Sequence, residues 1–83
     1  MTDYKNLPEE IDVDDLLRLK GIYLLGDVCQ IIPFSVHQIR FQAKKVENSK
    51  QECGTWMDQE LKRYLVDMEI FAKWIKRYLR DGE

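Results

Sequence analysis

The sequence predicts a small, mostly α-helical domain of three or four helices, with one short β-hairpin and a long amphipathic helix at the C-terminus. Three observations predict it: apolar residues at helical spacing on both sides of Pro33, turn-forming residues within 46–57, and a regular apolar repeat over 59–80. The length of 83 residues and the hydrophobic content of 45% suit one folded domain. We expect this domain to occupy residues 11–83, after a flexible N-terminal arm at 1–10.

The N-terminal region is predicted to contain the arm and one short helix. Residues 1–10 include Pro8 and show no helical periodicity, which is typical of an extended arm. Asp12 is a good N-cap for a helix with acidic residues in its first turn and with Leu16 and Leu17 turned inward. Gly21 is expected to end this helix.

Residues 23–45 show the pattern of two short helices joined by a tight turn. After Tyr23, Leu24 and Leu25, the apolar spacing predicts a first helix from Asp27 to Ile32, which Pro33 ends. Ser35 is a good N-cap for a second helix that runs to about Lys45. The side chains of this second helix that should face the core are those of Val36, Ile39 and Ala43.

The next predicted element is a β-hairpin over residues 46–57. Asn48, Ser49 and Gly54 are turn-forming types, and they lie between the apolar residues Val46 and Trp56. Asp58 is then expected to cap the long C-terminal helix at 59–80, which would measure roughly 33 Å at the standard rise.

The predicted helix at 59–80 has a wider apolar surface than a single packing contact requires. Its apolar sector covers roughly 180°, whereas one contact needs only about 100°. The helix therefore either lies across its own domain with most of its circumference buried, or uses half of this apolar sector to bind a second copy of the chain. We favour the homodimer, whose interface would contain Leu61, Leu65, Met68, Phe71, Ile75 and Leu79.

Charge is unevenly distributed along the chain. The formal net charge is −2, and residues 1–20 carry six acids against three bases. In contrast, residues 36–50 have a local charge of +3, because they carry Arg40, Lys44, Lys45 and Lys50 against Glu47. The basic residues thus coincide with the second helix of the helix-turn-helix pattern, which is where phosphate contacts would require them. The acidic stretch from Glu9 to Asp15 is explained by helix capping and solubility, or by a surface that binds a partner.

The sequence offers little support for catalysis, metal binding or a membrane. His37 is the only histidine, and Cys29 and Cys53 form no CxxC pair, so we expect no metal and no cofactor, and two free thiols in a cytoplasmic protein. There is no nucleophile elbow or phosphate-binding glycine loop, and no apolar run of transmembrane length. We therefore expect neither an enzyme nor a small-molecule substrate, and no membrane partner.

Several of these segments together resemble a known family. They are Leu24-Leu25, Asp27 to Ile32, the Ser-capped helix to Lys45 with its Ile39-Arg40 pair, and Gly54-Thr55-Trp56. From Tyr23 to about Leu65, the chain resembles the winged helix-turn-helix DNA-binding domain of MerR-type regulators, phage excisionases and AlpA-like regulators. The chain departs from the family where Pro33-Phe34 replaces a common glycine, and where Thr55 and Met57 replace the usual basic residues beside the aromatic.

The resemblance implies that the second helix binds double-stranded DNA. It places Ser35, His37, Gln38 and Arg40 at the major groove, and Lys44, Lys45 and Lys50 near phosphates. The chemistry agrees, because Arg can read guanine and Gln can read adenine, whereas Lys neutralises phosphate without reading sequence. For Lys44 and Lys45 the alternative is a solvated helix end whose charges suit the helix dipole.

Two functions follow as expectations. The first is a sequence-specific DNA-binding protein, either a transcriptional regulator or an excisionase-like architectural factor of a phage or mobile element. The alternative is a small acidic protein–protein regulator, such as a phage-type inhibitor or adaptor, that reuses the helix-turn-helix fold without binding DNA.

Overall fold

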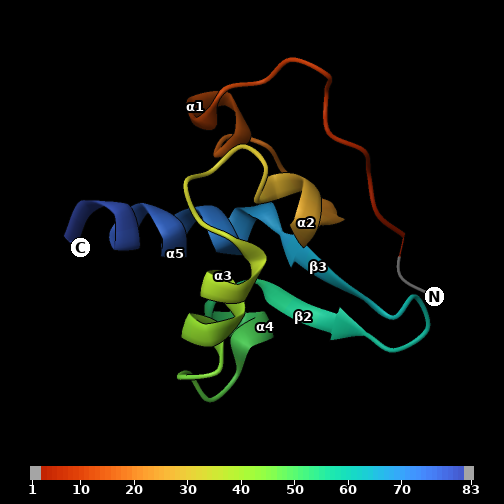
Figure 1. Cartoon of the computed structure of the whole chain (residues 1–83), viewed down its shortest axis with the longest axis vertical. Coiled ribbons are helices and arrows are strands. Elements are labelled where there is room, and N and C mark those ends of the chain that lie inside the picture. Colours follow the sequence, from red (N-terminus) through yellow and green to blue (C-terminus); the bar gives the residue numbers. More distant parts are fainter. Residues whose placement is uncertain (1–2, 82–83) are drawn as a thin grey trace.

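The computed structural model describes residues 3–81, and describes side chains for residues 3–77. Within this part, the chain forms five helices and one sheet of three strands (Figure 1). In chain order the elements are α1 (Val13–Leu16), β1 (Ile22–Leu24), α2 (Leu25–Val28), α3 (Val36–Ala43), α4 (Ser49–Glu52), β2 (Thr55–Asp58), β3 (Arg63–Asp67) and α5 (Met68–Asp81).

The sheet has β3 at its centre. Its strand order is β1-β3-β2, and both pairings are antiparallel. Tyr23 pairs with Val66, and Trp56 pairs with Leu65. Leu65 and Val66 are both fully buried, so the central strand is covered on its two faces. Strand β1 precedes α2, α3 and α4 in the chain, and it pairs with β3, which follows them.

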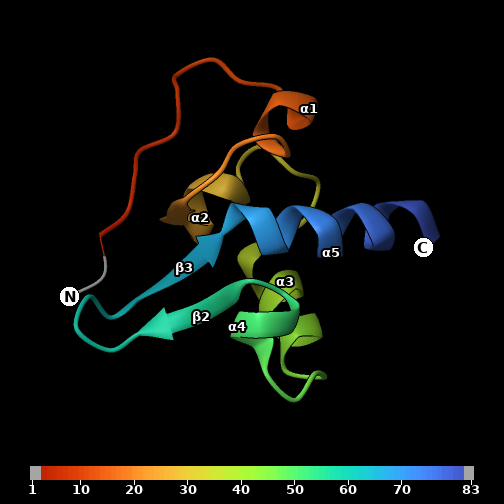
Figure 2. The same ribbon diagram turned by 180° about the vertical axis from the view of Figure 1, so that it is seen from behind.

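The hydrophobic core lies between the sheet and the helices. Helix α5 continues directly from β3 (Figure 2) and contributes its buried face to this core. Asp67 starts the helix, because its Oδ1 accepts a hydrogen bond from the backbone N–H of Glu69 at 3.1 Å. The principal core residues are Leu16, Leu17, Tyr23, Leu25, Val28, Ile32, Ile39, Val66, Met68, Phe71, Ala72 and Ile75.

The prediction of a mostly α-helical fold with a long C-terminal helix over 59–80 is wrong. The chain has an α+β fold in which residues 63–67 form β3, and α5 begins only at Met68. Asp58 Oδ1 accepts hydrogen bonds from the backbone N–H groups of Glu60 and Leu61, as a helix cap would, but residues 59–62 form a turn and not a helix. Lys62 completes this reversal with a φ of 57°, which a helix cannot contain.

The hairpin predicted over 46–57 is also displaced. Its predicted turn contains α4 instead, which Asn48 caps by accepting a hydrogen bond from the backbone N–H of Gln51 at 3.3 Å. The hairpin is formed by β2 and β3, and residues 59–62 make its turn. Turn-forming residues here mark the start of a short helix, because Asn and Ser cap helices as readily as they form turns.

The earlier elements agree better with the sequence. The prediction that Asp12 caps a helix is confirmed by a 2.8 Å hydrogen bond from the backbone N–H of Asp15. That helix ends at Leu16, and Gly21 instead turns the chain into β1 with a φ of +109°. The helix expected from Asp27 to Ile32 is shorter and begins earlier, at Leu25. In the N-terminal segment, the backbone N–H of Lys5 donates to the Ile22 carbonyl at 2.7 Å, so this part of the arm lies along β1.

Gly54 joins α4, β2 and α5 at a point where no side chain fits. Its φ is +76°, and a Cβ atom there would lie 2.8 Å from both the Asp67 carbonyl oxygen and the Phe71 backbone nitrogen. We expect Gly54→Ala to lower the free energy of unfolding by roughly 2–4 kcal/mol, since it adds left-handed backbone strain to a clash with backbone atoms. Urea denaturation followed by tryptophan fluorescence measures this change.

Gly26→Ala is the matched control for this variant. Gly26 lies in α2, its φ is not left-handed, and a Cβ atom there would meet nothing within 4 Å. Alanine at this position should stabilise the protein by ~0.5–1 kcal/mol, because it restricts the unfolded chain and favours the helix. Equal loss of stability in the two variants would contradict the role assigned to Gly54.

Candidate nucleic-acid interface

Helix α3 is held in place by a capped N-terminus and a buried inner face. Ser35 Oγ accepts a hydrogen bond from the Gln38 backbone N–H at 3.1 Å, and Gln38 Oε1 accepts one from the Ser35 N–H at 2.8 Å. This reciprocal pair satisfies two backbone donors that a helix start leaves unpaired. Ile39 is 1% exposed and Ala43 is buried, so the helix is anchored to the core by its inner face. The predicted Ser35 cap is confirmed.

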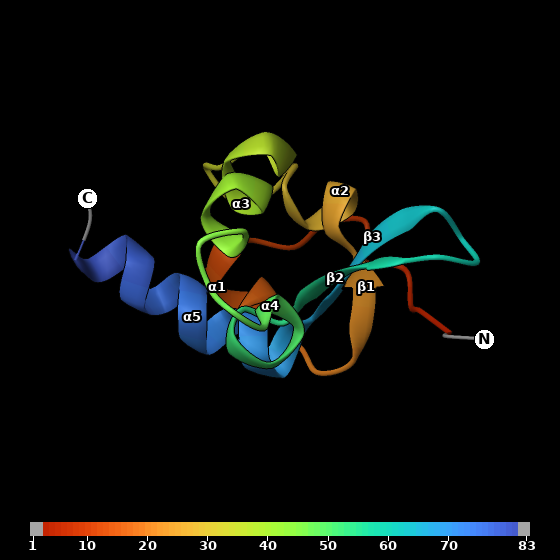
Figure 3. The same ribbon diagram turned by 90° about the horizontal axis from the view of Figure 1, so that it is seen from below.

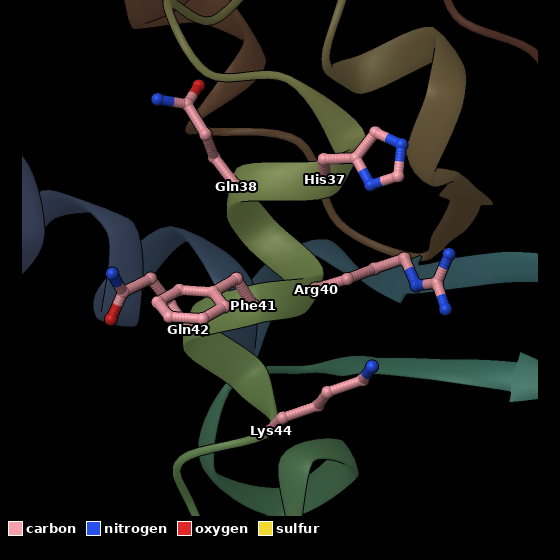
Figure 4. Close-up of a pocket in the computed structure, with 6 residues that line it drawn as sticks. All are labelled: His37, Gln38, Arg40, Phe41, Gln42 and Lys44. Carbon is pink, nitrogen blue, oxygen red and sulfur yellow. The ribbon is translucent and has the colours of Figure 1, made fainter.

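The outer face of α3 carries polar, basic and aromatic side chains around a shallow hollow. Its lining residues extend to both sides of the helix in Figure 4, and they are His37, Gln38, Arg40, Phe41, Gln42 and Lys44. His37, Gln38, Phe41 and Lys44 are exposed, whereas Arg40 and Gln42 are half-buried. Helix α3 therefore presents hydrogen-bonding and cationic groups on the side that faces away from the core.

Arg40 is the most constrained of these side chains. Its guanidinium carbon lies 4.2 Å from the centroid of the Tyr64 ring, on β3. Its Nε is buried and makes no hydrogen bond to any residue that the structure describes. A buried unpaired donor is unfavourable by about 1–3 kcal/mol, and the cation–π contact offsets part of that cost. The guanidinium is thereby held against the hairpin with a fixed orientation (Figure 4).

Two lysines near the C-terminal end of α3 also lie on aromatic rings. Lys45 Nζ is 4.7 Å from the centroid of Phe41, and Lys50 Nζ is 4.7 Å from that of Trp56. Such contacts keep a cation close to the surface while leaving its hydrogen-bond donors pointing outward. The side chains of Lys45 and Lys50 are thus folded against aromatic rings rather than extended into solvent.

A second hollow of about 180 Å³ separates α3 from the β2–β3 hairpin. Side chains of both the helix and the strands line it, and these residues are Arg40, Ala43, Lys44, Ser49, Thr55, Trp56, Met57 and Tyr64. The structure thus brings the helix and the hairpin together around a basic depression, although the hairpin is not the one that the sequence predicted.

The predicted DNA-binding residues fall on one part of the fold. Ser35, His37, Gln38, Arg40, Lys44 and Lys45 lie on α3 or at its ends, and Lys50 lies on α4. Arg40 and Lys44 line the hollow beside the hairpin, where Lys50 also reaches Trp56. Ser35 and Gln38 form the helix cap, so the Ser35 hydroxyl and the Gln38 side-chain oxygen are already engaged with the backbone.

Sequence reasoning missed Phe41 and Tyr64 as members of this site. Phe41 is four positions after His37 and therefore on the same helix face, which was a detectable signal. Tyr64 falls within the helix predicted over 59–80, and nothing local in the sequence indicated that it would meet Arg40. Lys62 and Arg63 also fall within that predicted helix, whereas they are exposed at the end of the hairpin.

The predicted dimer residues are mostly part of the core. Leu65, Met68, Phe71 and Ile75 are fully buried within the chain itself, and Leu61 is half-buried beside the hairpin turn. The side chain of Leu79 lies outside the described residues. The four buried side chains would have to leave the core to contact a second copy, so they cannot form an interface while this fold is intact.

The cysteines are free and poorly reactive. Cys53 is buried and Cys29 is half-buried, and neither takes part in a disulfide bond. Burial raises the pKa of the Cys29 thiol to about 11, and burial together with the nearby Glu52 raises the pKa of Cys53. Both thiols therefore stay protonated at neutral pH, which makes them weak nucleophiles and weak metal ligands.

Among residues 3–77, whose side chains the structure describes, no group of three or more His, Cys, Asp or Glu is placed to hold a metal ion. Over the described residues 3–81, no helix is both long enough and apolar enough to cross a lipid bilayer.

The Ser35 cap gives a direct test of how α3 is held. Ser35→Ala should lower the free energy of unfolding by ~1 kcal/mol, because it leaves the Gln38 N–H without its partner. Ser35→Asn is the matched control, since Asn supplies a capping oxygen without adding charge and should stay close to wild type. Urea denaturation measures both, and an alanine variant as stable as wild type would contradict the assigned cap.

Comparison of the chain with known protein families, curated proteins and solved structures gives no match. The function therefore has to be inferred from the residues and geometry of the chain itself.

Proposed function

We propose that this chain is a sequence-specific DNA-binding protein whose helix α3 enters the major groove. Its role would be that of a transcriptional regulator or an excisionase-like architectural factor of a phage or mobile element. The observation that carries the proposal is the outer face of α3. This helix is capped and anchored to the core, and its outward side chains are polar or cationic groups that could hydrogen-bond to bases and phosphates. Binding rather than catalysis is the proposed mechanism.

The dimensions of α3 support insertion into a groove. An α-helix with its side chains is about 10–12 Å in diameter, and the major groove of B-DNA is about 12 Å wide and admits one. The eight residues of α3 supply a length of about 12 Å along such a groove. In helix-turn-helix proteins, residues near the start of the recognition helix contact base edges. Gln38 and His37 occupy that part of α3, and Arg40 follows one turn later.

The basic residues around α3 supply phosphate contacts. Lys44 and Lys45 follow the last turn of α3, and Lys50 lies on α4. The hairpin adds two more exposed cations, because Lys62 ends its turn and Arg63 starts β3. The sequence has no basic residue directly beside Trp56, where the resembled family has them, and the β2–β3 hairpin carries Lys62 and Arg63 at its turn instead.

A second candidate function is that of a protein–protein regulator with an acidic surface. The exposed residues Glu9, Glu10, Asp12, Asp14 and Asp15 favour it, as does the net charge of −2. However, α1 and α4 lie at opposite ends of the molecule in Figures 1 and 2, so the acidic residues of α1 are remote from the basic end of α3. The acidic surface is therefore compatible with DNA binding, which we favour.

The salt dependence of binding to random duplex DNA tests the proposed function. Each phosphate contact releases counterions, so the logarithm of the binding constant should fall steeply with the logarithm of salt concentration. Lys44→Ala should weaken binding to all sequences and reduce the magnitude of this slope by about 1. Fluorescence anisotropy across a salt series measures both quantities.

Lys20→Ala is the matched control, because it removes the same charge from an exposed lysine elsewhere. The loop that contains it, between α1 and β1, lies across the molecule from α3 (Figure 3). The salt dependence of DNA binding by Lys20→Ala should have the same slope as that of the wild-type protein. Absence of binding by the wild-type protein at ~50 mM salt would rule out the proposed function.

The contact between Arg40 and Tyr64 gives a second prediction. Arg40→Ala should weaken binding to a preferred duplex by about 1–3 kcal/mol and relax its sequence preference. Tyr64→Leu should weaken it by roughly 0.5–1 kcal/mol, since the guanidinium loses the ring that orients it. Tyr4→Leu, at an exposed tyrosine in the N-terminal segment, should have no effect. If Tyr64→Leu binds as wild type while Arg40→Ala does not, the ring does not orient the arginine.

A further inference from the structure

Phe41 is an exposed aromatic residue at the most outward position of α3. Its side chain is 61% exposed, which is the largest value among the exposed large hydrophobic residues that the structure describes, the others being Tyr4 and Met57. At about 100° per residue, Phe41 points roughly 170° away from the mean direction of the core-facing residues of α3. If α3 enters a groove, Phe41 reaches deepest into it.

The neighbours of Phe41 are polar or cationic rather than apolar. His37 and Gln38 lie one turn before it, Lys44 lies one turn after it, and Lys45 Nζ rests 4.7 Å from its ring centroid. An exposed apolar ring within such a set is not part of the more apolar, charge-depleted patch that forms the buried core of a protein interface. It is suited to a surface that is mainly anionic and polar but contains isolated apolar groups.

The major groove of DNA is a surface of this kind. Its floor presents hydrogen-bonding base edges, its walls are phosphates, and its isolated apolar group is the 5-methyl group of thymine. Phenylalanine is among the side chains that contact this methyl group. The cations beside Phe41 would meet the phosphates while the ring lies at the base edges.

We propose that Phe41 is a specificity-determining residue that contacts the 5-methyl group of a pyrimidine in the major groove. This inference rests on the proposed function, and it names the chemical feature of DNA that the site recognises. Thymine and 5-methylcytosine carry the same methyl group at the same position, so each is a possible source of the contact.

The test removes or adds only the methyl group. Binding is measured to an alternating A-T duplex and to its A-U analogue, in which uracil replaces every thymine, at a temperature where both are fully paired. A second pair of probes is an alternating G-C duplex with either cytosine or 5-methylcytosine. Removing one buried methyl group should weaken binding about fourfold. The wild-type protein should therefore prefer the methylated member of at least one pair by about this factor.

Phe41→Ala should bind both members of each pair equally, while retaining the salt-dependent binding that phosphate contacts provide. Tyr4→Ala is the matched control, because Tyr4 is an exposed aromatic residue in the N-terminal segment rather than on α3, and it should keep the full methyl preference. Circular dichroism of each variant establishes that the fold is unchanged, and Phe41→Leu should retain part of the preference as an apolar replacement.

The outcomes separate this inference from the proposed function. Equal wild-type binding to the methylated and unmethylated members of both pairs would overturn the inference while leaving DNA binding in place. A methyl preference that persists in Phe41→Ala would overturn it as well. If the wild-type protein binds none of the four duplexes at low salt, the proposed function and the inference both fail.

Discussion

The pairing of β3 with both β1 and β2 is the interaction on which the rest of the structure depends. Leu65 and Val66 at the centre of this strand are fully buried, and each lies opposite residues of both neighbouring strands. Because β1 precedes the three helices α2, α3 and α4, while β2 and β3 follow them, the sheet closes the chain around these helices. The position of α3 is thus set by long-range pairing rather than by its immediate neighbours in sequence.

The same strand connects the core to the proposed interface. Leu65 is part of the core, and the preceding residue, Tyr64, places its ring under the guanidinium of Arg40. Alternate residues of a strand point to the same face, so Tyr64 shares a face of β3 with Val66 and packs against the core beside it. A rigid strand therefore orients a side chain of α3, and less conformational entropy is lost when that side chain binds a ligand.

The parts of the fold that the sequence predicted well are those with local causes. Asp12 and Ser35 cap their helices through hydrogen bonds to residues three positions later, so a short stretch of sequence contains the whole interaction. The predicted position of α3 was accurate for the same reason, and six of the seven residues assigned to DNA binding lie on it or at its ends. Local signals thus located the candidate site although the fold around it was wrong.

The parts that were predicted wrongly depend on distant contacts. Leu61, Leu65 and Met68 have helical spacing, but they belong to a turn, a strand and a helix respectively. Their spacing was accidental, and the choice between strand and helix was decided by pairing with β1, more than 40 residues earlier. Tyr64 was missed as a partner of Arg40 for the same reason. Phe41 was not singled out, although its helical spacing from His37 placed it on the same face of the helix.

The burial of the predicted dimer residues changes what DNA binding requires of a single chain. An interface through Leu65, Met68, Phe71 and Ile75 would expose the core, so this surface cannot double the number of phosphate contacts. For a single chain, affinity must come from the cations that it places around α3 and on the hairpin. Lys62 and Arg63 matter for this reason, because they are exposed at the turn of the β2–β3 hairpin. The net charge of −2 opposes such binding only weakly, since at physiological ionic strength charges beyond about 8 Å are largely screened. The local arrangement of cations, and not the total charge, therefore determines whether this protein binds DNA.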